Sequence, residues 1–363
     1  MNINTYIKTF GNKSFKEFPF NEVDGLIFAE MAYINFQLYI SSTQLIKLKD
    51  LEIKDRKAFY TGSVDYRQNE TMINLMRASH RYKDIKVGYC EYCNDDVNYQ
   101  QFFAFTIVLP NRDLYLSFRG TDTSLLGWKE DFKIAYQDMF PSQLMALSYT
   151  NKILEKHPNN FYLGGHSKGG NLAIYAALYM DEVYRPRMIK ATSYDGPGFR
   201  QDITKLDSFN ELHDRFEKFI TFNDVIGVVY NKIKETKIVY SNGILLGGHD
   251  PFTWKVNNKG LFALSKNRSQ ASKRSEEALM NWLTQLTDKQ KELAIKVLFD
   301  YLGESKTIYD LLLNGARIIA NGKKQLKKYK KEEVDEAKNI FRQLGRFYLS
   351  AYSPRRLVKK NNK

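Results

Sequence analysis

Short apolar runs alternate with helical patterns through the middle of the chain. The apolar runs have strand character and begin near residues 86, 101, 113, 160, 188, 217 and 236. Helical patterns, such as 142–156 and 171–181, lie between them. Strands that alternate with helices are typical of a mostly parallel sheet whose faces are covered by helices. We therefore predict an α/β core over residues 86–265.

The segments on either side of this core have different patterns. Residues 1–85 are polar and aromatic with helical periodicity, most clearly as an amphipathic stretch over Val23–Tyr33, and are predicted to pack on the core. After about residue 270 only helical patterns remain, so residues 266–363 are predicted to form a C-terminal helical extension. The chain shows no internal repeat.

The most informative motif is GHSKGG, at Gly165–Gly170. It follows the apolar run Asn160–Gly164 and opens an alanine-rich helical pattern. Glycines two residues before and after Ser167 let neighbouring backbone pass very close, as a sharp strand-to-helix turn requires. An exposed serine in a glycine-rich turn is the plain alternative, but the flanking strand and helix favour a nucleophile elbow. Ser167 is therefore the candidate nucleophile.

A serine hydroxyl needs a base to take its proton, and His249 is the candidate. It is the last of the five histidines, and it lies in a loop-like segment between the strand-like runs Lys237–Tyr240 and Phe252–Val256. The other histidines precede Ser167, adjoin it or lie in a charged helical stretch. His166, next to the serine, is expected to point away from the serine side chain.

Two aspartates compete to orient the imidazole of His249. Chain order in this class of hydrolase places the acid between the serine and the histidine, at the end of a strand. Asp224 and Asp195 both follow strand patterns. Asp224 is favoured because one more strand separates it from the elbow, and Asp195 is interpreted as a structural or pocket-lining carboxylate.

Two backbone amides are candidates for the oxyanion hole. The amide of Lys168 follows the nucleophile, and that of Thr121 lies where a strand pattern ends and a helical pattern begins. An ordinary loop with a helix-capping residue is the alternative for Thr121.

Four segments together resemble class 3 lipases, a branch of the α/β-hydrolases: Phe118–Thr121, the elbow, Asn223–Val225 and His249. Over about residues 1–310 the chain more closely resembles a bacterial family of lipase-like domains of unknown function. The resemblance implies an α/β-hydrolase fold and a triad of Ser167, Asp224 and His249, with Thr121 and Lys168 lining the oxyanion hole. It implies no particular substrate. Lys168 departs from the apolar residue usual in class 3 lipases, which leaves its side chain either solvated or in contact with substrate.

The composition is that of a globular protein, with 363 residues of which 43% are hydrophobic. No apolar run is long enough to span a bilayer, and residues 1–16 contain no apolar signal core, so we expect a cytoplasmic location. Cys90 and Cys93 have no further cysteine to complete a zinc site and are interpreted as reduced structural thiols. The expected mechanism needs no metal or organic cofactor, and the sequence predicts none.

The positive charge is concentrated at the C-terminal end. Residues 321–363 contain 14 Lys or Arg and four Asp or Glu, so they carry +10 of the net charge of +14. Such a tail suits an anionic membrane surface, which places the protein at the inner membrane, or nucleic acid bound without sequence specificity. A solvated helix with a basic end explains the same charges. The chain contains no nucleic-acid-binding module, which makes nucleic acid the weaker candidate.

Three functions of different classes follow from these patterns. The favoured one is a serine hydrolase that cleaves carboxylic esters, with acyl esters or lipids as substrates. A catalytically idle hydrolase fold used for binding and a basic membrane- or nucleic-acid-associated protein are the alternatives. The sequence does not separate lipase, esterase, thioesterase and acyl-transferase activity, because they share one acyl-enzyme intermediate.

Overall fold

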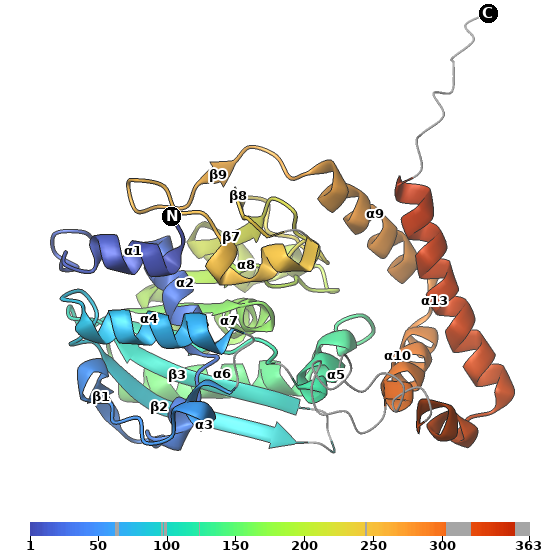
Figure 1. Ribbon diagram of the computed structural model, residues 1–363, viewed down its shortest axis with the longest axis horizontal. Helices are drawn as coiled ribbons and strands as arrows, with labels where there is room; N and C mark the ends of the chain where they lie inside the picture. The colour runs from blue at the N-terminus through green and yellow to red at the C-terminus, as the bar shows by residue number, and fades with distance from the viewer. Residues whose placement is uncertain are drawn as a thin grey trace, which may run out of the picture.

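The computed structural model describes residues 1–61, 65–95, 97, 100–122, 124–243, 245–302 and 321–352. Within these residues one sheet of nine strands follows the order of the chain (Figure 1). The strands are β1 (Leu45–Lys47), β2 (Lys86–Asp95), β3 (Gln100–Val108), β4 (Leu114–Phe118), β5 (Phe161–His166), β6 (Met188–Tyr194), β7 (Phe216–Thr221), β8 (Thr236–Val239) and β9 (Leu264–Ser265).

The sheet is parallel at its centre and antiparallel at both edges. Strands β4 to β8 are parallel to one another. Strands β1 to β3 join β4 in antiparallel pairs, and β9 pairs antiparallel with β8. The predicted α/β-hydrolase fold with helices on the sheet is confirmed, and β2 to β8 begin close to their predicted positions. β1 was not predicted, and it lies inside the segment interpreted as helical.

Each face of the sheet is covered by its own set of helices. Parallel strands that follow chain order with crossovers of one hand place their connecting helices on the same face. Accordingly, α6 (Pro141–Lys156) and α7 (Lys168–Tyr179) share an apolar cluster with Leu116 and Phe118 of β4. Tyr115, which directly precedes Leu116, points to the opposite face, where it packs with α1 (Ile3–Phe10), α2 (Glu22–Met31) and α4 (Tyr66–Ala78). The N-terminal segment thus supplies a layer that the core's own connections leave uncovered.

Helix α2 is buried on all sides, so the amphipathic interpretation of Val23–Tyr33 is wrong in detail. Every residue from Val23 to Met31 is buried. The backbone of α2 approaches the sheet closely at Gly25, where an added Cβ would lie 2.1 Å from the Tyr194 hydroxyl. The fully buried acid Asp24 of this helix is paired with the equally buried Arg81. Hydrophobic burial and this ion pair together fix the N-terminal layer on the sheet.

The C-terminal helices form a third layer at one end of the molecule (Figure 1). They are α9 (Gln270–Gln285), α10 (Asp288–Leu302) and α13 (Lys331–Tyr352), and they lie next to α5 (Leu125–Lys133). Phe132 of α5 meets Phe299 of α10 edge to face, with ring centroids 5.6 Å apart. The Ser272 hydroxyl at the start of α9 donates to the carbonyl of Asp224. None of the helices in the described ranges has the length and apolar character needed to cross a bilayer.

Candidate active site

Ser167 lies at the turn between β5 and α7, in a strained backbone conformation. Its φ is +57° and its ψ is −131°, a backbone conformation that residues other than glycine rarely adopt. The turn is so tight that a Cβ at Gly165 would lie 2.3 Å from the carbonyl carbon of Gly169, and one at Gly169 would lie 2.1 Å from the Phe118 oxygen. These contacts explain the glycines of the motif, and they leave Ser167 half-buried at the carboxyl edge of the sheet.

His249 is brought to this edge by a short 3-10 helix, η6 (Leu245–His249). Its ring lies on the ring of His166, with centroids 4.5 Å apart. Burial lowers the pKa of His249, which keeps the imidazole neutral and able to accept a proton. The run Phe252–Val256, predicted as a strand, instead begins in a second 3-10 helix, η7 (Pro251–Thr253), because the Asp250 side chain caps that turn at the amide of Phe252.

The carboxylate in contact with His249 is Asp195. His249 Nδ1 lies 2.7 Å from Asp195 Oδ2, and Asp195 is fully buried with a φ of +54° at the end of β6. Asp224, which the sequence analysis favoured for this contact, lies behind Asp195 at the end of β7. Its Oδ1 accepts hydrogen bonds from the amides of Ile226 and Gly227, at 2.8 and 3.0 Å. The roles expected for the two acids are thus exchanged. The order of residues along the chain carries no information about the distance from each carboxyl group to the imidazole.

The two aspartates also contact each other. Their carboxyl groups are within hydrogen-bonding contact, and burial raises the pKa of both Asp195 and Asp224. The charge of Asp195 raises the pKa of Asp224 further, because like charges repel in a medium that screens poorly, whereas the contact with Asp224 lowers the pKa of Asp195.

His166 and Tyr33 complete the surroundings of His249, and sequence reasoning assigned neither of them a role. His166 Nε2 is 2.8 Å from the His249 carbonyl oxygen, and Nδ1 is 3.0 Å from the Tyr33 hydroxyl. Burial lowers the pKa of His166 well below its usual value, so the ring is neutral. Since a carbonyl only accepts, Nε2 carries the hydrogen and Nδ1 accepts from Tyr33. His166 therefore fixes the backbone position of His249, whose ring lies against its own.

Thr121 lies on the loop that follows β4, beside the elbow. A Cβ at the preceding Gly120 would lie 3.1 Å from the Ser167 Cβ, which shows how closely the two loops pass. The Thr121 hydroxyl donates to Asp131 of α5. Burial raises the pKa of Asp131 to about 6. The structure thus places the loop that carries Thr121 beside Ser167.

The Lys168 side chain is buried in an ion pair. Its Nζ lies 2.7 Å from Glu130 Oε2 and 3.0 Å from the Gln101 carbonyl oxygen. The Lys168 side chain is 3% exposed and that of Glu130 is fully buried. The solvated arrangement considered from the sequence is therefore wrong. The signal that was missed is Glu130, whose position one turn into α5 faces the elbow.

Other reactive groups in the described residues do not add to this cluster. No group of three or more His, Cys, Asp or Glu side chains within the described ranges is arranged to hold a metal ion. Cys90 and Cys93 are free thiols on β2. Burial raises the pKa of Cys90 to about 12, which disfavours a reactive thiolate.

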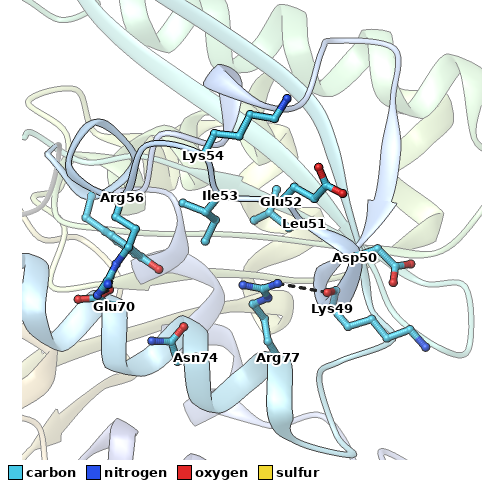
Figure 2. A pocket seen from close by; sticks show the side chains of 11 residues that line it. Lys49, Asp50, Leu51, Glu52, Ile53, Lys54, Arg56, Glu70, Asn74 and Arg77 are labelled. Carbon is cyan, nitrogen blue, oxygen red and sulfur yellow. Dashed lines mark hydrogen bonds and ion pairs between the residues drawn. The ribbon is translucent and has the colours of Figure 1, made fainter.

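A pocket of about 670 Å³ opens in the N-terminal layer, and none of the candidate site residues lines it (Figure 2). Its walls come from the segment 49–54 and from α4, and the Arg77 side chain donates to the Lys49 carbonyl across it. An exposed ion pair between Arg56 and Glu70 closes one side. The pocket is therefore separate from the site around Ser167.

The sheet, the strained serine between β5 and α7 and the paired imidazole and carboxylate define a lipase-like α/β-hydrolase. The sequence model of the family described as Mbeg1-like matches residues 76–300, and the chain belongs to this family. Among solved structures, the chain is similar to one described as M37 lipase, with a TM-score of 0.40 and 17% identity. That match covers 58% of this chain and 70% of the lipase chain. The comparison with curated proteins gave no match.

Proposed function

We propose that this protein is a serine hydrolase that cleaves carboxylic esters through an acyl-enzyme intermediate. The observation that carries the proposal is the hydrogen bond between His249 Nδ1 and Asp195 Oδ2 beside the elbow that presents Ser167. A neutral imidazole that donates from Nδ1 to a carboxylate has its lone pair on Nε2. That nitrogen is the base for the serine hydroxyl.

The steps follow from these roles. His249 Nε2 takes the proton of Ser167 as the serine oxygen attacks the ester carbonyl, and Asp195 stabilises the imidazolium that forms. The amides of Thr121 and Lys168 donate to the oxyanion of the tetrahedral intermediate. His249 then returns the proton to the leaving alcohol, and water attacks the acyl-enzyme by the same route in reverse. Acyl esters and lipids are the proposed substrates.

The test is labelling of the purified protein by a fluorophosphonate probe, which reacts with activated serines without requiring the natural substrate. We expect labelling of the wild type and loss of labelling in Ser167→Ala and His249→Ala. The exposed Ser41 and His213 provide matched controls, and their alanine variants should label like the wild type.

Two results would count against this proposal. A folded wild type that does not label favours the binding-protein alternative. Labelling that survives Ser167→Ala places the reactive serine elsewhere. If the expected pattern is found, hydrolysis of p-nitrophenyl esters of increasing acyl length then measures the size of the acyl site.

A further inference from the structure

The contact between Asp195 and Asp224 leaves two oxygen atoms without a donor. Asp195 Oδ2 bonds to His249, and Asp224 Oδ1 bonds to two backbone amides. The remaining oxygens, Asp195 Oδ1 and Asp224 Oδ2, are both buried and receive no hydrogen bond from any donor. A buried carboxylate oxygen without a donor is costly, and two in neighbouring carboxyl groups are costlier still.

A single proton satisfies both oxygens at once. We infer that Asp224 is protonated and that its Oδ2–H donates to Asp195 Oδ1, so that the pair carries one negative charge, located on Asp195. A neutral carboxyl group donates from one oxygen and accepts at the other, and Asp224 has this pattern of partners. Asp195, which faces His249, accepts on both sides and has the pattern of a carboxylate.

The surrounding charges favour this distribution. Lys218 of β7 is buried and attracts both carboxyl groups. One carboxylate balances this ammonium, whereas two would leave an uncompensated negative charge in the interior. His249 faces Asp195 from η6, and the charges of Asp131 on α5 and of Asp250, which caps η7, act on His249.

Asp224 is then a positioning residue that acts through Asp195, a role that rests on the proposed function. Its proton fixes the Asp195 carboxylate in the rotamer that reaches His249 Nδ1. The two acids therefore have different tasks, although the sequence presents both as an aspartate at the end of a strand. Substitutions that keep or remove the Oδ2 donor separate these tasks.

The first test compares Asp224→Asn, Asp224→Ala and Asp195→Asn by the rate of fluorophosphonate labelling. The asparagine amide at position 224 replaces the Oδ2–H donor and retains the acceptor for Ile226 and Gly227. We expect its rate to stay within about tenfold of the wild type. Asp224→Ala removes the donor, and its labelling rate should fall by about 10- to 100-fold. The labelling rate of Asp195→Asn should fall on the order of 10⁴-fold, because the imidazole takes the wrong tautomer.

The second test is independent of activity. Infrared spectroscopy at neutral pH should show the C=O stretch of a buried protonated carboxyl group in the wild type, shifted in D₂O and absent from Asp224→Asn. Burial also raises the pKa of Glu30, to about 8, so this group contributes a second band. A Glu30→Gln variant identifies that band separately. Urea unfolding of each variant establishes that it is folded.

The results distinguish this inference from the proposed function. If the wild type labels and the labelling rate of Asp224→Asn falls as far as that of Asp195→Asn, Asp224 is the charged acid and the inference is overturned. Absence of a protonated carboxyl band that depends on Asp224 overturns it as well. If the folded wild type does not label, the proposed function fails, and the infrared band alone decides whether the two carboxyl groups share a proton.

Discussion

The ring of His166 orders His249, the residue that we propose as the base. Its Nε2–H donates to the His249 carbonyl, and its Nδ1 depends on the Tyr33 hydroxyl for a donor. These partners fix the tautomer of His166 and with it the backbone of η6. Side-chain chemistry alone does not reveal this role, because Tyr33 and His166 are separated by 133 residues.

We expect Tyr33→Phe to slow fluorophosphonate labelling several-fold and to lower the free energy of unfolding by about 1–2 kcal/mol, since a buried ring nitrogen loses its donor. Tyr115→Phe is the matched control, because it removes an equally buried hydroxyl that donates to Gly25, away from His249. Its unfolding free energy should fall by a similar amount with no change in labelling. Equal labelling by both variants would contradict a positioning role for Tyr33.

At the scale of elements, the Lys168 side chain connects the start of α7 to α5. Glu130 is the centre of this connection, since it accepts from Lys168 and, through its other oxygen, from the amide and hydroxyl of Ser142 at the start of α6. Three helices therefore meet at one buried carboxylate beside Ser167. A buried charge with good partners is tolerated, but the loss of one partner leaves the other uncompensated.

We expect Lys168→Met to lower the free energy of unfolding by about 3–5 kcal/mol, because Glu130 keeps its charge without a counterion. The double variant with Glu130→Gln should recover most of this loss. Urea unfolding measures both. A single variant as stable as the wild type would show that the ion pair contributes nothing to the attachment of α5.

At the scale of the whole molecule, the C-terminal helices join the active-site edge to the most basic part of the chain. They pack on α5, and the Ser272 hydroxyl of α9 donates a hydrogen bond to the Asp224 carbonyl oxygen. A group of lysines precedes α13. The end of the basic tail, residues 353–363, lies outside the described residues. We propose that these charges hold the protein at an anionic membrane surface, where an acyl-lipid substrate would be presented to Ser167.

We expect the full chain to sediment with vesicles that contain phosphatidylglycerol but not with vesicles of phosphatidylcholine, and to be released by high salt. Replacing Lys323, Lys324, Lys327 and Lys330 by Gln should weaken binding by about 100-fold or more, since each lysine contributes about 1 kcal/mol. Labelling of Ser167 should not change. Equal binding to neutral vesicles would contradict an electrostatic attachment, and stronger binding to DNA than to vesicles would favour the nucleic-acid alternative.

Local patterns were sufficient for much of this fold. The strands from β2 to β8 could be predicted because each is a short apolar run bounded by turn residues. The turn at Ser167 could be predicted because the clash that glycine avoids arises within a few residues and across one neighbouring strand. The short strands β1 and β9 could not, because two or three residues pair only where a neighbouring strand offers an edge.

The sequence by itself determined the class of fold, the position of the strained serine and the histidine that follows it. It did not determine which aspartate contacts His249, where the Lys168 ammonium lies, or that His166 donates a hydrogen bond to the His249 carbonyl. These depend on distances of a few ångströms between residues far apart in the chain, and only the packing of the strand ends sets such distances. Chain order gives the sequence of strands, whereas the contact of Asp195 with His249 and of Asp224 with Asp195 is decided by how the loops after β6 and β7 meet at one edge.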